Sequence, residues 1–320
     1  MIFAVANRLP EPALALLREA GEVRLDERER AIPRADLLAL VAGADAALTL
    51  LHDRVDEELL EAAGPQLRCV ANVAVGYDNV DLAAAERRGV AVTNTPGVLD
   101  DATADLTMAL ILAATRRLGE GDRLVRSGAP WSWGMGFMLG ASLQGKRLGI
   151  VGLGGIGTRV AERARAFGMA IAYHSRTPAP AAREAALEAE RLPLPRLLAE
   201  SDVVSLHCPL TPETRHLIGA AELAAMKPSA VLVNAARGPI VDEAALATAL
   251  EEGRIAAAGL DVFEREPAVE PRLLGLENAV LTPHLGSATV ETRTAMAELA
   301  ARNAISVLRG QGPLTLVTAQ

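Results

Sequence analysis

The stretch Leu148–Gly157, which reads LGIVGLGGIG, constrains the fold of this chain more than any other part of it. A short apolar run, typical of a buried parallel strand, is followed by Gly152, Gly154 and Gly157 in the spacing G-x-G-x-x-G. Thr158–Phe167 then has the apolar spacing of a helix. In this context the first glycine permits a tight turn, the second lets a pyrophosphate approach the backbone, and the third lets helix and strand pack closely. A structural turn in some other α/β domain is the alternative, but we predict a dinucleotide site. The residues expected to form it in this loop are Leu153, Gly154, Gly155, Ile156 and Gly157.

The segment that follows the next predicted strand, Ala170–His174, indicates which dinucleotide binds. A site for NAD places Asp or Glu about 20 residues after the glycines, on the ribose 2′-hydroxyl. Here the sequence is HSRT and contains no carboxylate. Arg176 can pair with a 2′-phosphate, and Ser175 and Thr177 can donate hydrogen bonds to it. We therefore predict a preference for NADP(H); NAD is the alternative if Arg176 is only a solvated loop residue.

Composition bounds the class of protein. A chain of 320 residues predicts two domains. Because only 2% of the residues are aromatic, the core is expected to consist of Ala, Leu and Val. A net charge of −8 argues against a nucleic-acid-binding surface. No apolar run is long enough to span a membrane, and the N-terminus lacks a basic signal-peptide segment. Cys69 and Cys208 lie in apolar runs and are expected to be free thiols in a reducing compartment, so we predict a cytoplasmic protein.

Residues 1–99 alternate between short strands and helices, which predicts a parallel sheet with helices on both faces. The expected strands are Ile2–Ala6, Val23–Leu25, Ala46–Leu51, Leu67–Val73 and Val90–Val92. The expected helices are Pro12–Ala20, Arg34–Val41, Glu57–Ala63 and Asp81–Arg88.

A long helix is expected next, capped by Asp100 or Asp101 and running to about Leu118 as the connection between two domains. Its predicted apolar stripe consists of Leu106, Ala109, Leu110 and Ala113. Both tryptophans of the chain lie in the stretch Gly128–Gly140. Clustered aromatic residues in a loop more often pack at an interface than bind a ligand, so we expect this stretch to contact a second subunit.

Residues 100–285 are expected to contain six strands, with the glycine turn after the first, in the doubly wound arrangement that binds dinucleotides. These strands begin near Leu148, Ala170, Val203, Ala230, Ala256 and Ala279, and the helices between them include Arg196–Ala199, Ala220–Ala225 and Glu243–Glu252. A last helix, Thr289–Arg309, is expected to return to the first domain. We therefore predict a dinucleotide-binding domain, 100–285, inserted into a domain made of 1–99 and 286–320, with a cleft between them.

Three side chains with complementary chemistry follow the last three of these strands. Arg237 follows the first of the three, Glu266 the second and His284 the third. Ligands of such sheets bind outside the carboxyl ends of the strands. A histidine can protonate a carbonyl oxygen near neutral pH, a carboxylate can keep it protonated, and an arginine can hold a substrate carboxylate. Each also has a plainer explanation, as a strand-ending arginine, a solvated acid or a satisfied loop histidine.

At these residues the chain resembles the D-isomer-specific 2-hydroxyacid dehydrogenases, and within them it is most similar to glyoxylate/hydroxypyruvate reductases. The resemblance covers nearly the whole chain, and its motifs are specific only in combination. The matching segments are VGYDNVD at 75–81, TNTPGV at 93–98, DATAD at 101–105, GLGGIG at 152–157, HCPLTPET at 207–214, MKP at 226–228, NAARG at 234–238, GLDVFEREP at 259–267 and TPHLGSA at 282–288.

The resemblance implies a Rossmann dinucleotide-binding domain inserted into a flavodoxin-like substrate domain, both doubly wound. It implies that Arg237 binds the substrate, that His284 is the proton donor and that Glu266 is its partner. It also implies a homodimer. The further residues it assigns to substrate are Leu51, Val75 and Gly76, and those it assigns to the cofactor are Thr103, Pro209, Thr214, Ala235, Ala236, Asp261, His284 and Gly286. His52 stands where relatives more often have serine, which leaves the substrate range open.

The expected activity is the NADPH-linked reduction of glyoxylate or hydroxypyruvate to glycolate or D-glycerate. An NAD-dependent D-3-phosphoglycerate or other D-2-hydroxyacid dehydrogenase is the alternative within the class, although no cationic cluster for a substrate phosphate is evident. A dinucleotide-sensing corepressor is the alternative outside it, disfavoured by the complete Arg, Glu and His set. No metal, nucleic acid or membrane is expected as a partner.

Overall fold

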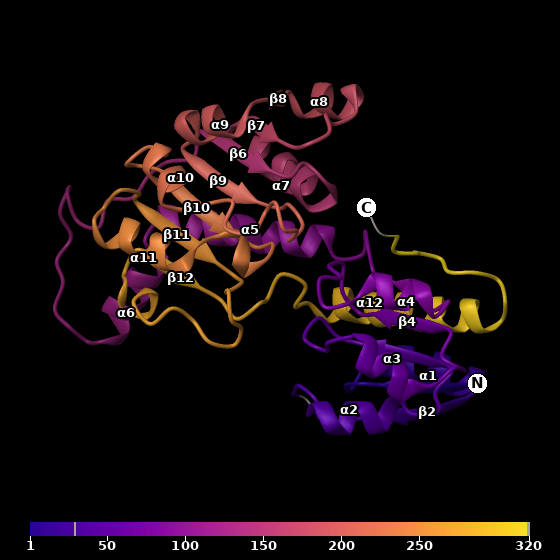
Figure 1. Cartoon of the computed structure of the whole chain (residues 1–320). Helices are drawn as coiled ribbons and strands as arrows, with labels where there is room; N and C mark the ends of the chain where they lie inside the picture. The colour runs from indigo at the N-terminus through magenta and orange to yellow at the C-terminus, as the bar shows by residue number, and fades with distance from the viewer. Residues whose placement is uncertain (29, 319–320) are drawn as a thin grey trace. The chain divides into compact units, whose positions relative to one another are not determined.

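The computed structural model describes residues 1–28 and 30–318, and the chain forms two compact units (Figure 1). Unit 1 comprises Met1–Leu99 and Ala288–Gln320, and unit 2 comprises Asp100–Ser287. The last two residues of the predicted segment 286–320 lie outside the described residues.

Unit 1 contains a parallel sheet of five strands in the order β2-β1-β3-β4-β5. This is the flavodoxin-like order of doubly wound folds. The strands are β1 (Ile2–Val5), β2 (Glu22–Leu25), β3 (Ala46–Thr49), β4 (Cys69–Asn72) and β5 (Ala91–Thr93). The helices are α1 (Glu11–Ala20), α2 (Arg34–Val41), α3 (Glu57–Ala63), α4 (Leu82–Arg87) and α12 (Val290–Leu308). The C-terminal helix α12 packs against α1 and β4, so both ends of the chain contribute to this unit.

Unit 2 contains a parallel sheet of seven strands in the order β12-β11-β10-β9-β6-β7-β8. Read from its other end, this is the Rossmann order 3-2-1-4-5-6 with β12 added. The strands are β6 (Arg147–Val151), β7 (Ala170–His174), β8 (Glu190–Arg191), β9 (Val203–Leu206), β10 (Val231–Asn234), β11 (Ala257–Leu260) and β12 (Ala279–Leu281). The helices are α5 (Asp100–Thr115), α6 (Leu118–Arg126), α7 (Gly155–Ala166), α8 (Ala181–Leu187), α9 (Leu194–Glu200), α10 (Ala220–Ala225) and α11 (Glu243–Glu251), and short 3-10 turns are η1 (Gly238–Ile240) and η2 (Leu273–Gly275).

The core of unit 2 lies on both faces of its sheet, as the unbroken apolar strands require. Strands β9, β10 and β11 are buried at every position. One face is covered by α5 and α7, which pack against each other, and the other by helices that include α9, α10 and α11. Leu, Ile, Val and Ala make up most of both core clusters, so the low aromatic content is compatible with a well-filled core.

Three expectations for unit 2 are wrong. The sheet has seven strands and not six, because the two-residue edge strand β8 pairs with β7. The helix that begins at Asp100 ends at Thr115, and a second helix, α6, starts after Arg117 in the left-handed conformation (φ 54°). The predicted stripe of α5 is also displaced, because Leu110 is buried but Ala109 is exposed. The buried residues of α5 are Thr103, Ala104, Thr107, Met108, Leu110, Ile111, Ala114 and Thr115.

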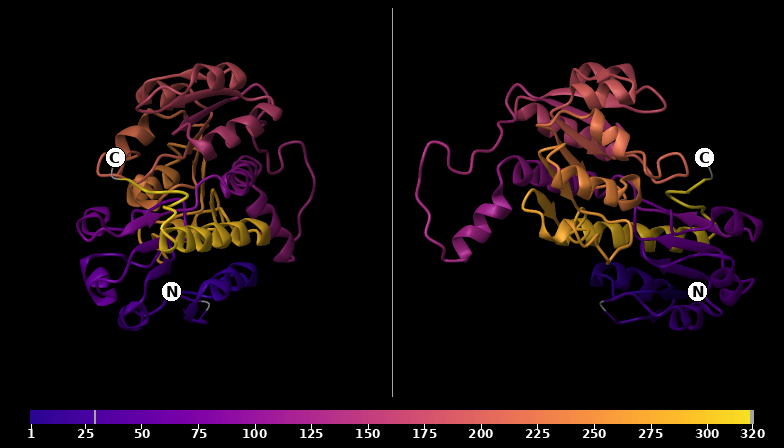
Figure 2. Two further views of the ribbon diagram at one scale, coloured as in Figure 1. Left: turned by 90° about the vertical axis from the view of Figure 1, so that its right-hand side faces the viewer. Right: turned by 60° about the vertical axis from the view of Figure 1, so that its left-hand side comes forward.

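The segment from α6 to β6 extends away from the body of unit 2 as a long arm (Figures 1 and 2). None of its residues between Leu118 and Gly140 is buried. Within the part of the chain that the structure describes, no helix is long and apolar enough to cross a bilayer.

Candidate active site

The glycine turn between β6 and α7 has the geometry that its spacing predicts. Gly152 has a φ of 98°, and a Cβ there would lie 2.7 Å from the backbone N of Cys208. A Cβ at Gly157 would lie 2.2 Å from the carbonyl oxygen of Gly152, so only glycine lets α7 pack this close to the turn. By contrast, a Cβ at Gly154 would meet nothing within 4 Å. The open side of the turn, at the N-terminus of α7, can therefore receive a phosphate group.

Neighbouring residues of this turn are held by the loop after β7 and by the start of α5. The N–H of Leu153 donates to Oγ of Ser175 at 3.0 Å. A Cβ at Gly155 would lie 2.2 Å from a carboxylate oxygen of Asp100, so the side chain of Asp100, at the start of α5, lies directly against this glycine. Ile156 is partly buried against the core on the α5 and α7 face. The predicted cofactor residues from 153 to 157 thus form the turn and the first residues of α7, and Ser175 lies directly beside Leu153.

The loop Ser175–Thr177 is fixed from the edge strand. Nη2 of Arg191, on β8, donates to the carbonyl oxygens of both Ser175 and Arg176, each at 2.9 Å. Arg183, on α8, donates to the carbonyl oxygen of Leu153 at 3.2 Å. Neither Arg183 nor Arg191 belongs to a motif recognised in the sequence.

The loop after β9 closes on itself. Oγ1 of Thr214 donates to the carbonyl oxygen of Pro209 at 2.7 Å and accepts from the N–H of Thr211 at 2.7 Å. The pKa of Glu213 is lowered, chiefly by a hydrogen bond from Thr211 and to a smaller extent by the charge of Arg176. This loop and the Ser175–Thr177 loop therefore lie near the same region of unit 2.

The carboxyl ends of β10, β11 and β12 are in register, which brings three of the predicted loops to one edge. Asn234 pairs with Leu260, and Leu260 pairs with Leu281. The residues that follow these strands therefore start at the same level of the sheet, as parallel pairing requires.

His284 and Glu266 meet at this edge. Nδ1 of His284 lies 2.9 Å from Oε2 of Glu266, with side chains 26% and 31% exposed. The other carboxylate oxygen of Glu266 accepts from the N–H of Phe263 at 3.0 Å. Burial raises the pKa of Glu266, but the hydrogen bond and charge of His284, with smaller contributions from Phe263 and from the charge of Arg237, outweigh it and leave the pKa lowered. Glu266 is therefore ionised near neutral pH and can stabilise a protonated imidazole.

His284 is held in the left-handed conformation, with a φ of 55°, by the residue that follows β11. Its N–H donates to the carbonyl oxygen of Asp261 at 2.8 Å. The carboxylate of Asp261, which is only 1% exposed, accepts from the N–H groups of Leu285 and Gly286 at 2.7 and 2.8 Å and from Oγ1 of Thr282 at 2.7 Å. A strained backbone of this kind persists only when its surroundings fix it. Asp261 thus positions the whole loop that carries His284.

Gly286 lies against Thr103, another predicted cofactor residue. A Cβ at Gly286 would lie 3.3 Å from Cγ2 of Thr103 and 3.4 Å from a carboxylate oxygen of Asp261. Thr103 is 4% exposed and sits on the first turns of α5. The three predicted residues are therefore neighbours.

Arg237 is placed by the residues on either side of it. Asn234 ends β10 and ties down the turn, since its side chain donates to the carbonyl oxygen of Arg237 at 2.9 Å and accepts from the N–H of Ala236 at 3.1 Å. A Cβ at Gly238 would lie 1.9 Å from the carbonyl carbon of Phe263. Only glycine at 238 therefore lets the loop that bears Arg237 pack on the segment that leads to Glu266. Ala235, at the start of this turn, is 9% exposed.

The predicted substrate residues of unit 1 lie on loops after β3 and β4. The carbonyl oxygen of Val75 accepts from Asn94 at 2.8 Å, and that of Gly76 accepts from Asn72 at 2.9 Å. Leu51 is 38% exposed. The loop that bears it is closed by Asn79, whose side chain donates to the carbonyl oxygens of Leu50 and Asp53 at 3.1 and 2.9 Å.

The residues that hold these loops are the ones that sequence reasoning missed. They share one property, which is that a side chain binds the backbone of a loop elsewhere in the chain: Asn72, Asn79, Asn94, Arg183 and Arg191. Asn79 and Asn94 lie in the matching segments at 75–81 and 93–98, and Asn72 lies in the predicted strand Leu67–Val73, but nothing in the sequence indicated which backbone groups their side chains bind. In the described part of the chain, no group of three or more His, Cys, Asp or Glu side chains could hold a metal ion.

The comparison with known proteins agrees with this geometry. Residues 108–286 match the family model described as D-isomer specific 2-hydroxyacid dehydrogenase, NAD binding domain. The chain belongs to this family, and it is an NAD(P)-dependent dehydrogenase of 2-hydroxy acids.

Individual proteins of known sequence or structure are similar to nearly the whole chain. The chain is 51% identical to the glyoxylate reductase of Thermococcus litoralis, over 98% of this chain and 95% of that protein. A crystal structure of a protein from Thermus thermophilus has a TM-score of 0.93 at 48% identity and covers 99% of this chain and 100% of that one. A further structure, of an NADPH-dependent glyoxylate/hydroxypyruvate reductase from Sinorhizobium meliloti in complex with NADP and malonate, has a TM-score of 0.85 at 36% identity, with 99% and 96% covered.

Proposed function

We propose that this protein is an NADPH-preferring reductase that converts the small 2-oxo acids glyoxylate and hydroxypyruvate to glycolate and D-glycerate. The observation that carries the proposal is the His284–Glu266 pair at the carboxyl edge of a Rossmann sheet, 2.9 Å from nitrogen to oxygen. The glyoxylate reductases to which the chain is about half identical support the choice of substrate.

The roles of the residues follow from their chemistry. When bound, the reduced nicotinamide supplies a hydride to the keto carbon. His284 donates a proton to the carbonyl oxygen, and Glu266 stabilises the imidazolium before the transfer. Arg237 holds the substrate carboxylate, as a guanidinium can with two parallel hydrogen bonds.

We assign substrate binding in unit 1 to Leu51 and to the backbone N–H groups of Val75 and Gly76. The N–H of Gly76 shares a peptide group with the carbonyl oxygen of Val75, which accepts a hydrogen bond from Asn94. The N–H of Val75 shares one with the carbonyl oxygen of Ala74, which accepts from the N–H of Thr95 at 2.9 Å. These bonds support the assignment because they fix the orientation of both peptide groups. Unit 2 is then the cofactor-binding domain of the pair predicted from sequence, 100–285, and unit 1 the substrate-binding one.

The residues present fit a dinucleotide. The turn at Gly154 is open, the first N–H groups of a helix such as α7 have no partner within the helix, and Thr103, Asp261 and Gly286 are neighbours. A carboxylate for the ribose 2′-hydroxyl is absent from the loop Ser175–Thr177, and Arg176 stands there instead. This supports NADPH over NADH, as does the NADP bound to the Sinorhizobium meliloti relative.

The test is a set of initial rates on glyoxylate, hydroxypyruvate and pyruvate, each with NADPH and with NADH. We expect the highest kcat/KM for glyoxylate or hydroxypyruvate with NADPH. Replacing His284 by Ala should reduce kcat by a factor on the order of 10²–10⁴ while NADPH still binds. Undiminished turnover in His284→Ala, or no turnover of any 2-oxo acid by the wild-type protein, would overturn the proposal.

We also propose that the protein is a homodimer joined through the arm Leu118–Gly140. Trp133 is 76% exposed and Met135 is 82% exposed, and no residue of the arm is buried in the chain itself. An apolar segment of this kind marks a protein interface. Trp133→Arg should therefore yield monomers in sedimentation velocity, whereas Leu274→Arg, at a 66% exposed apolar residue outside the arm, should leave the dimer intact. A dimer that persists in the Trp133 variant would refute the assignment.

For the compartment we propose the cytoplasm. Cys69 and Cys208 are both free, and burial raises the pKa of their thiols to about 12 and about 11. Two unreactive, unpaired thiols are compatible with a reducing environment. Fractionation of cells that produce the protein would test this.

A further inference from the structure

The loop that precedes α8, the helix α8 and the edge strand β8 each carry one arginine that forms no ion pair with a described carboxylate. Arg176, Arg183 and Arg191 form no ion pair with any carboxylate in the described ranges 1–28 and 30–318. The acids of the same stretch have other partners: Glu184 binds the hydroxyl of Tyr173, Glu188 binds Arg165, and Glu190 pairs with Arg147 and Arg196. Positive charge is therefore left over beside the glycine turn.

Arg191 is the member of this group with the most specific geometry. A single nitrogen, Nη2, donates to two consecutive carbonyl oxygens, those of Ser175 and Arg176, at 2.9 Å each. Two accepted hydrogen bonds fix the two peptide planes, and with them the direction in which the side chains of the loop leave the backbone. Arg191 contributes no bond to the glycine turn itself, which Ser175 and Arg183 contact.

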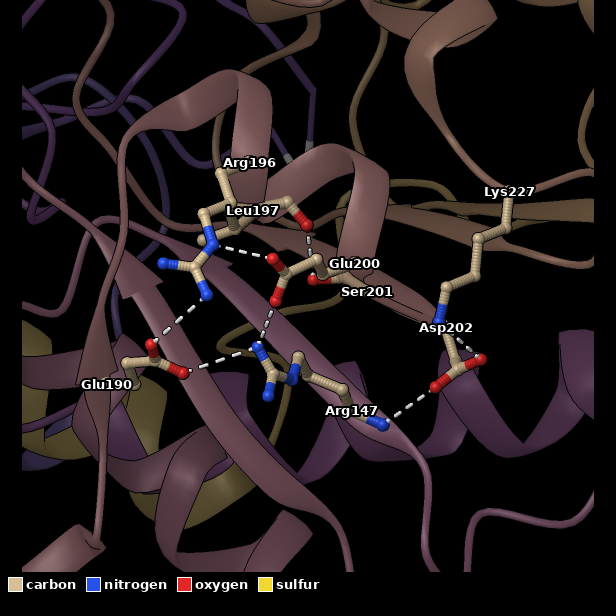
Figure 3. A network of polar contacts seen from close by, with 8 residues as sticks. All are labelled: Arg147, Glu190, Arg196, Leu197, Glu200, Ser201, Asp202 and Lys227. Carbon is tan, nitrogen blue, oxygen red and sulfur yellow. Dashed lines mark hydrogen bonds and ion pairs between the residues drawn. The ribbon is translucent and has the colours of Figure 1, made fainter.

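The strand that bears Arg191 is itself anchored. In β8, Tyr173 pairs with Arg191 and Ala172 pairs with Glu190. Figure 3 shows Glu190 between two guanidinium groups, Arg147 at 3.4 Å and Arg196 at 3.7 Å. The two residues of the strand thus divide their contacts, because Glu190 reaches the network at the amino edge of the sheet and Arg191 reaches the loop at the carboxyl edge.

The network in Figure 3 does not itself offer a binding site. It borders a surface hollow of about 480 Å³, but its charges are satisfied internally, with Arg147 at 2.6 Å from Glu200 and Lys227 at 3.0 Å from Asp202. Its contribution is to hold the end of β8 in place.

We infer that Arg191 is a positioning residue for recognition of the cofactor's 2′-phosphate, and that it adds its charge to that of Arg176 and Arg183. It orients Arg176 through the backbone and attracts the phosphate dianion through space, so it acts on NADPH and not on NADH. This inference rests on the proposed preference for NADPH. The negative charge of Glu213, which is felt by Arg176, opposes binding of the phosphate, so the charge of the three arginines must outweigh that of one carboxylate.

The experiment compares cofactor binding by wild type, Arg191→Gln and Arg191→Lys, with 2′,5′-ADP and 5′-AMP as fragments that differ by the phosphate alone. In Arg191→Gln we expect the Kd of NADPH and of 2′,5′-ADP to rise roughly tenfold, which is the effect of weakening one charge-assisted interaction of the phosphate. The Kd of NADH and of 5′-AMP should change less than about twofold, because these ligands lack the phosphate. Arg191→Lys should restore part of the loss, because it keeps the charge and can donate to both carbonyl oxygens.

Arg165→Gln is the matched control. Arg165 also donates to a backbone carbonyl oxygen of the same stretch, that of Ala186 at 2.5 Å, but makes no contact with the loop Ser175–Thr177. It should leave both dissociation constants unchanged. An equal rise in the Kd of NADH and of NADPH in Arg191→Gln would show a merely structural role and overturn the inference. A Kd of NADPH that stays at the wild-type value would also overturn it. A wild-type protein that binds NADH as tightly as NADPH would overturn the proposed preference together with the inference.

Discussion

Replacing Glu266 by Gln should change the pH dependence of catalysis. The Glu266 carboxylate accepts a hydrogen bond from His284 at 2.9 Å, and Gln keeps an acceptor there but loses the charge. A hydrogen bond to a charged group contributes about 1.5–3 kcal/mol, and the lower end applies because both side chains are a quarter to a third exposed. About 1.4 kcal/mol corresponds to a factor of ten. The variant should therefore have a roughly tenfold lower kcat/KM for the reduction on the alkaline limb of the pH profile.

The sign follows from which form of the imidazole is needed. Reduction consumes the protonated form, and a carboxylate beside the imidazole stabilises that form better than a neutral amide does, so the deficit of the variant should be largest at alkaline pH. The pKa of Glu266 itself is lowered, so this carboxylate stays ionised across the assay range. Activity of Glu266→Gln should thus approach that of the wild type at the acidic end of the profile.

The chain supplies a matched control in Glu264→Gln. Glu264 lies two positions away and also faces a histidine, with Oε1 at 3.1 Å from Nε2 of His216. Its neutralisation should leave kcat/KM on the alkaline limb unchanged. A Glu266→Gln profile that coincides with that of the wild type, measured as kcat/KM from about pH 5 to about pH 10 with saturating cofactor, would refute the role given to the pair. A loss of the same size in Glu264→Gln would show that the effect is a general one of charge.

Three further predictions concern stability. Gly157→Ala should destabilise unit 2 by at least about 2 kcal/mol, because its Cβ would lie 2.2 Å from a carbonyl oxygen. Gly154→Ala, in open space, should change the free energy of unfolding by less than about 1 kcal/mol but weaken NADPH binding. Urea titration measures the first effect, and a fluorescence titration with NADPH measures the second. Asp261→Asn should reduce the free energy of unfolding by about 1–3 kcal/mol and lower kcat, since a buried acceptor of three hydrogen bonds is lost; unchanged kcat would contradict its positioning role. Burial lowers the pKa of His207 from 6.5 to about 4, so on acidification the unfolded chain takes up a proton before the folded chain does. The free energy of unfolding should therefore fall by up to roughly 3 kcal/mol as the pH drops from 6.5 to 4. Urea titrations of His207→Gln over this range should show a smaller fall.

Much of unit 2 is predictable because its signals are local. The apolar run, the three glycines and the following helix are consecutive in sequence, and β6 and α7 form where they predict. The meeting of Glu266 and His284 is also predictable, since parallel strands that end in register place the residues after them at one edge. Steric need explains the glycines, as a side chain at Gly157 or Gly238 would overlap the backbone.

Other parts have no local signal. The strand β8 has two residues, both charged and exposed, so neither alternation nor apolarity marks it, and it exists because β7 offers an unpaired edge. The break between α5 and α6 depends on Arg117 adopting a left-handed conformation, which glycine and asparagine favour but arginine does not. The displaced stripe of α5 has a related cause. This helix contacts α7 and three strands, so its buried surface is wider than one stripe.

The position of His284 illustrates why the chemistry of such a site is easier to predict than its geometry. The histidine is recognisable because its side chain suits proton transfer, yet its own loop does not favour its backbone conformation. That conformation is imposed by Asp261, which follows the neighbouring strand and takes three hydrogen bonds from the loop in addition to the one its carbonyl oxygen accepts from His284. The site of proton donation is therefore determined by the pairing of β11 with β12, and a change that shifts this register by one residue would displace the imidazole even with every residue of the His284 loop intact.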